Sequence, residues 1–504
     1  MRNLAAIAVL LATALNPAAA QPISRHPENP HYFLFRGKPT ILITSAEIYG
    51  AVLNLDFAYR KYLDALAAGG ANYTRIYTGS YFEPQHKWFK NHSLGPADGR
   101  HCLPWGRSST PGYAHGGNKF DLDTWNPEFF SRLKDYIRYA GTKGIVVEVA
   151  LYNAQKNWTW PLHPLNIANN VNDVGKVTYA DFQALVEPKL TSYQKAYVRK
   201  ITQEVNEFDN VILEIIDEPT IRSGGSLIAT SGDKATAWIS EMVDAVIAAE
   251  AGLSNKHLIA QQVEGGGAQG PVDFSADHRV PVITGQYGWQ NGNQVGSFKL
   301  LDQKYGLEKP IEFNETSVYP LWYPGGDRFA HSRVEAWEFI VGGGAGFNQL
   351  NSLYATGNED AAGTCNEVIL HQLKLLQDFM HSFDFVRMRR DEKLLAAPLP
   401  PGTFGRGMSE VGRQYAFYLH HSRNPKANDS LFLCYETQPG SYEEDLDFRL
   451  APGQYCVEWV EPATNKVLRS STVAHAGGVR RFRTPRYMVD VALRIKRSQE
   501  MDRR

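Results

Sequence analysis

Two glutamates each close a short apolar run of the sequence. Glu218 follows residues 210–217 (NVILEIID) and precedes Pro219, while Glu315 closes residues 309–315 (KPIEFNE). Continuous apolar runs of this length are typical of parallel strands that are buried on both faces. Side chains at the ends of such strands often line active sites. Glu218 and Glu315 are therefore the first candidates for chemistry.

A pair of carboxyl groups on either side of an anomeric carbon can hydrolyse a glycosidic bond. At a separation of about 5–5.5 Å one carboxylate attacks and the other donates and then recovers a proton, whereas wider spacing admits water and inverts the configuration. The proton donor needs a raised pKa, and the nucleophile must stay ionised. Alone, Asp217-Glu218-Pro219 is more often a solvated turn, so Glu315 is the residue that favours catalysis.

Arg75 is the candidate cation beside these acids. It lies in residues 71–78 (ANYTRIYT), a predicted strand in which Arg75 and Tyr77 share one face because strand side chains alternate. Both side chains can therefore point into a pocket and keep a nucleophile ionised. The alternative is that Arg75 only pairs with Glu148 or Glu214 in the protein interior.

The elements that must position these residues alternate between strand and helix from about residue 39 to residue 380. We expect strands at 40–46, 71–78, 145–151, 211–217, 257–263, 280–287, 310–315 and 345–350, and helices at 57–68, 127–142, 179–208, 234–251, 295–305, 332–342 and 367–381. Eight strand-then-helix units fit an α/β fold of the (β/α)₈ TIM barrel type with enlarged loops. An open doubly wound sheet is the alternative, but no G-x-G-x-x-G follows the first strand.

The spacing of the two glutamates agrees with this arrangement. Residues 218 and 315 are 97 positions apart, which equals three strand-helix units of roughly thirty residues each. Glu218 should therefore end the fourth strand and Glu315 the seventh, on opposite sides of one barrel mouth.

The C-terminal part of the chain has a different pattern. After residue 384 come a Leu399-Pro-Pro-Gly402 break and short strand-like runs at 415–420, 430–435, 454–460, 466–471 and 488–495. About a hundred residues of short strands predict a small all-β sandwich. We expect a signal peptide at 1–20, the catalytic barrel at 21–383 and the sandwich at 384–504. Trp459 is more typical of a sandwich core than of a sugar platform.

The N-terminus has the pattern of a secretory signal. Arg2 precedes an apolar stretch at 4–15, and Ala18-Ala19-Ala20 forms an A-x-A cleavage site. The stretch is too short to span a bilayer, although a membrane anchor is the alternative. No later segment is apolar enough to span either. We expect cleavage after Ala20 and a secreted or periplasmic protein.

Export makes disulfides possible for the four cysteines. Cys434 and Cys456 both lie in strand-like segments and could pair, and Cys102 and Cys365 would both lie in loops above the barrel. The sequence leaves the connectivity open, including four free thiols. No C-x-x-C or H-E-x-x-H spacing occurs, so we expect no metal and no cofactor.

Charge and composition narrow the class of partner. The chain has 52 basic and 53 acidic residues and a formal net charge of −1, which argues against a nucleic-acid partner. Its 10 Trp, 25 Tyr and 24 Phe suit both sugar-binding clefts and cores. We expect a carbohydrate substrate and set no expectation for the oligomeric state.

The order of these features resembles clan A retaining glycosidases, in particular the cellulase- and mannanase-like branch (glycoside hydrolase family 5-like) with an added C-terminal β-domain. The matching residues, in order along the barrel, are Arg75, Asp217-Glu218-Pro219, Tyr287 in ITGQYGW, and Lys309-Pro310 with Glu315. The resemblance implies a retaining mechanism with Glu218 as acid/base and Glu315 as nucleophile. It also implies a hydrogen bond from Tyr287 to the nucleophile.

Asp217 departs from the pattern of that clan, which usually has Asn before the acid/base to contact the sugar 2-hydroxyl. An aspartate can accept a hydrogen bond from that hydroxyl but cannot donate one. Its negative charge should raise the pKa of Glu218, and it would suit an unusual sugar or 2-substituent. An outward-turned Asp217 would weaken the resemblance.

The loops after the strands supply the remaining candidates for substrate contacts, because barrel enzymes build their sites there. Trp158 and Trp160 lie in a polar loop and could stack on sugar rings or anchor the loop. The other candidates for substrate binding are Glu47, Tyr152, Asn153, Trp289, Trp322 and Asn348.

Two other functions compete with glycoside hydrolysis. One is a non-catalytic carbohydrate-binding protein on a glycosidase-like barrel, which the charge of Asp217 leaves open. The other is a secreted esterase or protease, for which no G-x-S-x-G motif is present. Activity on a panel of glycosides discriminates among the three.

Overall fold

The computed structural model describes residues 21–498 except 47–49, 79–80, 84–90, 220–230, 264–270, 287–296, 317–328, 352 and 424–435. Within them, eight parallel strands form the barrel that the sequence predicts, in the spatial order β4-β13-β12-β11-β10-β9-β8-β5. The strands are β4 (Leu42–Ala46), β5 (Tyr73–Tyr77), β8 (Val146–Asn153), β9 (Val211–Asp217), β10 (Leu258–Gln262), β11 (Val282–Gln286), β12 (Ile311–Glu315) and β13 (Gly346–Leu350).

The barrel closes between β4 and β5 through the backbone and side chain of Asn72. Asn72 donates its backbone N–H to the Ile43 carbonyl at 3.3 Å. Its side-chain amide accepts from Ile43 N at 2.8 Å and donates to the Ile41 carbonyl at 2.9 Å. An asparagine side chain thus supplies hydrogen bonds of the kind that a strand ladder makes elsewhere. Closure brings the C-terminal ends of all eight strands to one mouth.

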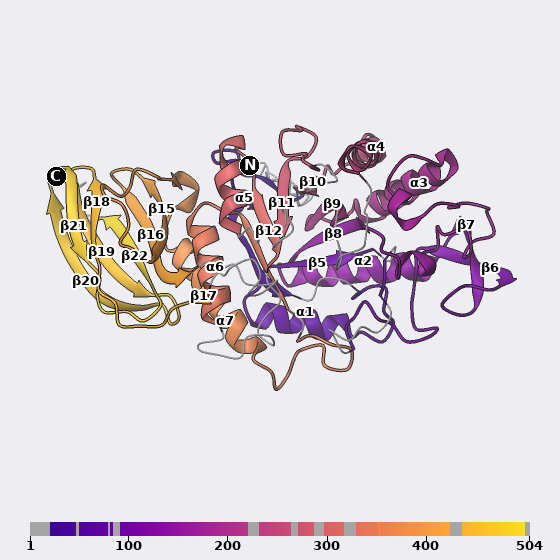
Figure 1. Ribbon diagram of the computed structural model, residues 1–504, viewed down its shortest axis with the longest axis horizontal. Coiled ribbons are helices and arrows are strands. Elements are labelled where there is room, and N and C mark those ends of the chain that lie inside the picture. Colours follow the sequence, from indigo (N-terminus) through magenta and orange to yellow (C-terminus); the bar gives the residue numbers. More distant parts are fainter. Residues whose placement is uncertain are drawn as a thin grey trace, which may run out of the picture.

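Helices surround the barrel (Figure 1). They are α1 (Tyr59–Ala68), α2 (Pro127–Thr142), α3 (Pro188–Val205), α4 (Gly232–Glu250), α5 (Ser297–Lys304), α6 (Ala330–Val341) and α7 (Asn366–His381). At the start of α2 the Asn126 side chain accepts from Glu128 N, as the sequence predicts for a helix with proline in its first turn.

Helix α3 is shorter than predicted. It begins at Pro188 instead of residue 179, and residues 179–181 form a separate 3₁₀ turn. The residue before a proline avoids the helical region, and Glu187 is extended with φ −125° and ψ 104°. The proline therefore sets the first helical residue.

Some elements were not predicted. The strands β1 (Ser24–Arg25), β2 (Phe33–Phe35) and β3 (Lys38–Thr40) form a small sheet before the barrel. A hairpin of β6 (Trp105–Pro111) and β7 (Asn118–Trp125) rises from the long loop after β5. Figure 1 shows this hairpin at the end of the molecule opposite the C-terminal strands.

The C-terminal strands form the predicted β-sandwich. One sheet contains β14 (Arg389–Arg390), β15 (Thr403–Glu410), β16 (Gln414–Arg423), β17 (Glu436–Thr437), β19 (Gly453–Glu461), β20 (Lys466–His475) and β22 (Asp490–Arg497), and β18 (Asp445–Leu450) pairs with β21 (Gly478–Arg483). Trp459 is 2% exposed and belongs to the sandwich core, as expected. The predicted strand at 430–435 lies outside the described residues, and the domain boundary at 384 stays a prediction.

The sandwich packs on the barrel through α6, which lies beside it in Figure 1 and is buried along its whole length. Arg333 of α6 forms an ion pair with Asp490 at 2.9 Å, and Trp337 stacks on Tyr418 with ring centroids 5.5 Å apart. The sandwich therefore covers the barrel on the side of α6.

Two remaining expectations concern cysteines and membrane spans. Cys102 and Cys456 are free thiols, so neither candidate pairing has formed; Cys434 lies outside the described residues, as does the predicted signal at 1–20. Across the described residues, every helix is too short or too polar to span a bilayer.

Candidate active site

Three carboxylates meet at the barrel mouth. Asp217 ends β9, Glu218 follows it, and Glu315 ends β12, and one carboxylate oxygen from each lies within 4.8 Å of those of the other two. The side chains of Glu218 and Glu315 are 11% and 5% exposed. Residues 97 positions apart in the chain thus reach one small volume, as the spacing of the strands predicted.

Glu315 reaches the mouth because of an irregularity in the sheet. Strand alternation places it on the face of Phe313, which points outward and packs near Phe339 of α6. Between β11 and β12, however, Gly285 pairs with Phe313 and the next residue, Gln286, pairs with Glu315. Such a bulge re-aims the side chains that follow it. The sequence identified Glu315 but not the reason for its direction.

Glu218 has a backbone conformation that is uncommon for a residue with a side chain. Its φ is 54°, in the left-handed region, which costs a non-glycine residue about 1–3 kcal/mol unless its surroundings hold it there. Its backbone N–H donates to Gln262 Oε1 at 2.8 Å, and its Oε1 accepts from Gln286 Nε2 at 3.0 Å. Both glutamines come from neighbouring strands, so the barrel fixes the direction of this carboxyl group.

Asp217 points inward and is fully buried. Its carboxylate accepts hydrogen bonds from Arg75 Nη2 at 2.7 Å, from Asn153 Nδ2 at 2.5 Å and from the Tyr77 hydroxyl. Asn153 also donates to the Tyr77 oxygen at 2.8 Å. The outward orientation that would have weakened the resemblance is therefore not adopted.

Arg75 lies both beside Glu214 in the barrel interior and near Glu315 at the mouth. Its guanidinium binds Glu214 inside the barrel through Nε at 2.8 Å and Nη2 at 2.5 Å, and the same Nη2 reaches Asp217. Its Nη1 lies 3.8 Å from Glu315 Oε2. Arg75 is thus a buried cation that forms ion pairs with Glu214 and Asp217 and also faces Glu315. Its positive charge favours the ionised form of Glu315.

Further acidic residues lie in the barrel interior, beneath the carboxylates at the mouth. Glu148 and Glu312 are fully buried in the barrel, and Asn314 donates to Glu214 at 3.2 Å and is 3.5 Å from Glu148. Burial and then the charge of Glu214 raise the pKa of both Glu148 and Glu312, that of Glu312 to about 8. Neither carboxyl oxygen of Glu312 has a hydrogen-bond partner among the described residues. In the folded state Glu312 is therefore mainly neutral below about pH 8.

This neutral carboxyl makes a prediction about stability. Because the folded pKa of Glu312 is about 8 and the unfolded value is 4.5, the unfolded chain releases the proton first as pH rises. The contribution of Glu312 to stability is thus present below pH 4.5 and is lost by pH 8. Glu312→Gln should raise the melting temperature over wild type more at pH 8 than at pH 5. Glu241→Gln, on a partly exposed helix position, is the control. A constant difference across this range would contradict the prediction.

The pKa of Glu218 itself is raised, as the proton donor in a glycosidase requires. Burial is the largest cause, and the charge of Asp217 contributes in the same direction, as the sequence predicted. The Lys156 ammonium and the hydrogen bond from Gln286 oppose the rise. The negative charge of Asp217 thus favours the protonated form of Glu218, and the positive charge of Lys156 favours the ionised form.

Lys156 and Gln286 are site residues that the sequence analysis missed. Lys156 Nζ lies 3.1 Å from Glu218 Oε2 and 6.0 Å from the centre of the Trp158 ring, which places that predicted aromatic beside the site. The available signals were weak: a single lysine within an aromatic loop, and a glutamine one residue before Tyr287.

Other predicted residues lie elsewhere. The Tyr152 hydroxyl donates to the Gln194 carbonyl of α3 at 3.0 Å, so this side chain packs among the outer helices and not in the mouth. Asn348 is fully buried and bridges strands, accepting from Ala46 N at 3.2 Å and donating to the Asn314 carbonyl at 3.1 Å. Both side chains are thus held by protein partners, and their contact with a substrate stays a prediction. Glu47, Tyr287, Trp289 and Trp322 lie outside the described residues.

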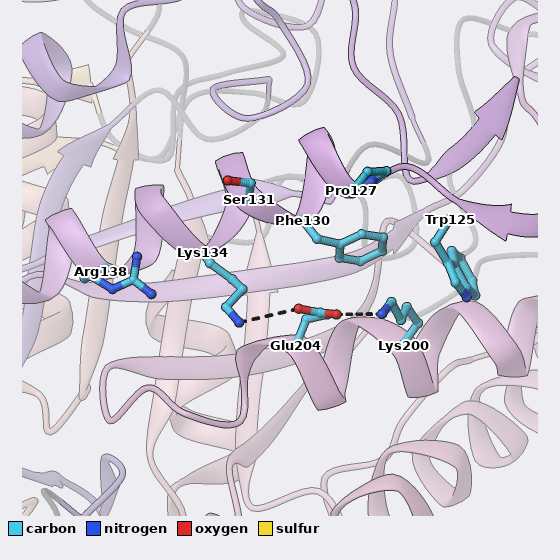
Figure 2. Close-up of a pocket in the computed structure, with 8 residues that line it drawn as sticks. All are labelled: Trp125, Pro127, Phe130, Ser131, Lys134, Arg138, Lys200 and Glu204. Carbon is cyan, nitrogen blue, oxygen red and sulfur yellow. Dashed lines mark hydrogen bonds and ion pairs between the residues drawn. The ribbon is translucent and has the colours of Figure 1, made fainter.

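A surface pocket of about 430 Å³ lies between α2 and α3, on the outside of the barrel (Figure 2). Three of its charged groups pair with one another: Glu204 pairs with Lys200 at 2.6 Å and with Lys134 at 3.6 Å. It is lined by Trp125, Pro127, Phe130, Ser131, Lys134, Arg138, Lys200 and Glu204. This position on the helix layer separates the pocket from the carboxylates at the strand ends.

Comparison with known proteins identifies the fold. No family model and no curated protein sequence matches the chain. A solved glycoside hydrolase structure matches with 13% identity and a TM-score of 0.59, covering 95% of this chain and 97% of the other. A glycoside hydrolase family 5 structure from Bacteroides vulgatus matches with 12% identity and a TM-score of 0.58, covering 95% and 93%. The chain therefore shares its fold with these glycoside hydrolase structures over nearly its whole length.

Proposed function

We propose that this protein is a retaining glycoside hydrolase in which Glu315 is the nucleophile and Glu218 is the acid/base. The observation that carries the proposal is the approach of the Glu218 and Glu315 carboxylate oxygens to within 4.8 Å of each other at the barrel mouth. Retaining enzymes need about 5–5.5 Å between the two carboxyl groups, and inverting enzymes about 6.5–9.5 Å. An approach of this kind is closer to the retaining range than to the inverting range, so it favours retention.

In the first step, a Glu315 oxygen attacks the anomeric carbon while the bond from that carbon to the leaving oxygen breaks. The Glu218 proton passes to the leaving oxygen, which departs as an alcohol. The Arg75 guanidinium, 3.8 Å from Glu315, keeps the attacking group ionised. The raised pKa of Glu218 keeps a proton available for transfer.

In the second step, water attacks the same carbon and the bond to Glu315 breaks. Glu218, now ionised, takes the water proton and returns to its starting state. Two displacements at one carbon restore the original configuration. The proposed substrate is a polysaccharide or oligosaccharide, and the proposed location is outside the cytoplasm, on the pattern of residues 1–20.

The stereochemical outcome tests this proposal directly. The protein would be incubated with a panel of α- and β-glycosides and oligosaccharides, and the first-formed anomer would be followed by proton NMR before mutarotation. We expect release of a sugar with the configuration of the substrate. Inversion would overturn the retaining assignment. Saturable sugar binding with no release on any substrate would favour the non-catalytic carbohydrate-binding alternative.

A further inference from the structure

The loop after β8 brings a lysine into contact with the proposed acid/base. Lys156 Nζ lies 3.1 Å from Glu218 Oε2, and its side chain is only 16% exposed. The ammonium also donates to the Tyr81 hydroxyl at 2.9 Å and lies 3.8 Å from Glu83 Oε1. Tyr81 in turn donates to Glu83. Lys156 is thus enclosed between two carboxylates and a phenol, with an acceptor near each of its three donors.

We propose that Lys156 is a positioning residue that holds the Glu218 carboxyl toward the mouth and stabilises the negative charge that develops on it as its proton leaves. This inference rests on the proposed function, because it assigns a role in the proton transfer of that reaction. It adds a residue that neither the sequence pattern nor the pair of glutamates requires.

The charges around Glu218 explain why a cation is needed there. Asp217 is adjacent and ionisable, Glu315 lies within 4.8 Å, and the Tyr77 phenol lies on the same side. Arg75 is engaged by Asp217 and Glu214 and faces Glu315, but it forms no ion pair with Glu218. Among the described residues, Lys156 alone places a cationic side chain within 4 Å of the Glu218 carboxylate.

Lys156 affects the rate because the charge of Glu218 changes during the reaction. Glu218 is neutral before glycosylation and anionic after it, so a fixed ammonium stabilises the transition state more than the ground state. The low dielectric of a largely buried site strengthens this interaction. The effect matters most for leaving groups that need a proton, such as sugar alcohols, and least for activated phenols that leave as anions.

The experiment replaces Lys156 with methionine, which keeps the length of the side chain and removes its charge. We expect the basic limb of the kcat/KM–pH profile, which reports the acid of the free enzyme, to move up by about 1–3 pH units. The loss of kcat/KM should be larger for a sugar leaving group than for dinitrophenolate. Lys156→Arg should keep the limb near its wild-type position. Lys195→Met, which removes a lysine of α3 that pairs with Glu241 of α4, should change neither the basic limb nor the dependence on the leaving group.

A second readout does not depend on turnover. The Glu218 carboxyl would be titrated by carbon-13 NMR in protein labelled at glutamate, with Glu218→Gln to assign its signal. We expect its pKa to rise by about 1–3 units in Lys156→Met. An unchanged titration and an unchanged limb in a folded variant, checked by its melting temperature, would overturn the inference. A shifted titration in a protein that hydrolyses no glycoside would instead overturn the proposed function and keep the electrostatic pairing.

Discussion

Replacing Glu315 with alanine is expected to lower kcat by at least about 10⁴-fold on every substrate, because removal of a covalent nucleophile leaves only binding and electrostatic stabilisation. Glu218→Ala should lower kcat/KM about 10²–10⁴-fold where the leaving group needs a proton, and little where it does not. Its kcat should fall on both kinds of substrate, because the water of the second step loses its base. Glu315 lies 3.8 Å from Arg75, and the melting temperature of each variant shows whether the fold is kept. The measurement is steady-state kinetics on matched sugar and dinitrophenyl substrates.

Azide, as an added nucleophile, distinguishes the role of the catalytic nucleophile from that of the acid/base. With Glu315→Ala it attacks from the nucleophile side, so the glycosyl azide should have the inverted configuration. With Glu218→Ala it replaces the activated water in the second step, so the product should have the retained configuration. Glu367→Ala, at an exposed position at the start of α7, is the control and should keep wild-type activity. Full activity in either active-site variant would show that its assignment is wrong.

Arg75→Met is expected to be the most destabilising single change at the site. The guanidinium is fully buried and binds Glu214 and Asp217 at 2.5 and 2.7 Å. Removing one partner of a buried ion pair leaves an uncompensated charge and costs about 3–5 kcal/mol. We expect a clear fall in melting temperature, together with loss of activity because Asp217 and Glu315 lose their cation. Differential scanning calorimetry and the activity assay measure the two effects.

A double variant tests whether uncompensated buried charges cause the loss of stability in Arg75→Met. Arg75→Met with Glu214→Gln removes one of the uncompensated charges, so it should be more stable than Arg75→Met alone. Arg138→Met, in a half-exposed pair with Glu207, should melt close to wild type. If Arg75→Met melts like wild type, the buried network contributes little to the fold, and Arg75 acts only in the site.

Variants of Glu315 and of Arg75 should behave differently, because the two residues lie in different layers of the barrel mouth. Glu315 and Glu218 form the upper layer, where small exposed fractions leave room for contact with a sugar. Arg75, Glu214 and Asp217 form a buried support whose charges cannot all be ionised without the guanidinium. A substitution in the upper layer should therefore change rate more than stability, and one in the support should change both.

The sequence alone determined the elements with strong local signals. The eight barrel strands lie within about two residues of the predicted ranges, because buried parallel strands are continuously apolar and are bounded by polar or turn residues. Helix α2 has the predicted bounds at residues 127 and 142, because an asparagine cap and a first-turn proline act over a few residues. The same local order placed Glu218 and Glu315 at strand ends.

Only the tertiary structure decided how those residues meet. The direction of Glu315 depends on a bulge that forms between two strands, and Tyr152 turned toward the helices while its neighbour Asn153 reached Asp217. The contact of Lys156 with Glu218 joins two loops 62 positions apart in the chain. Each of these outcomes comes from pairing and packing between distant segments. A local pattern of apolar and polar residues does not specify such pairing. The sequence therefore identified the two glutamates and Arg75, but not Lys156, the cation that contacts Glu218.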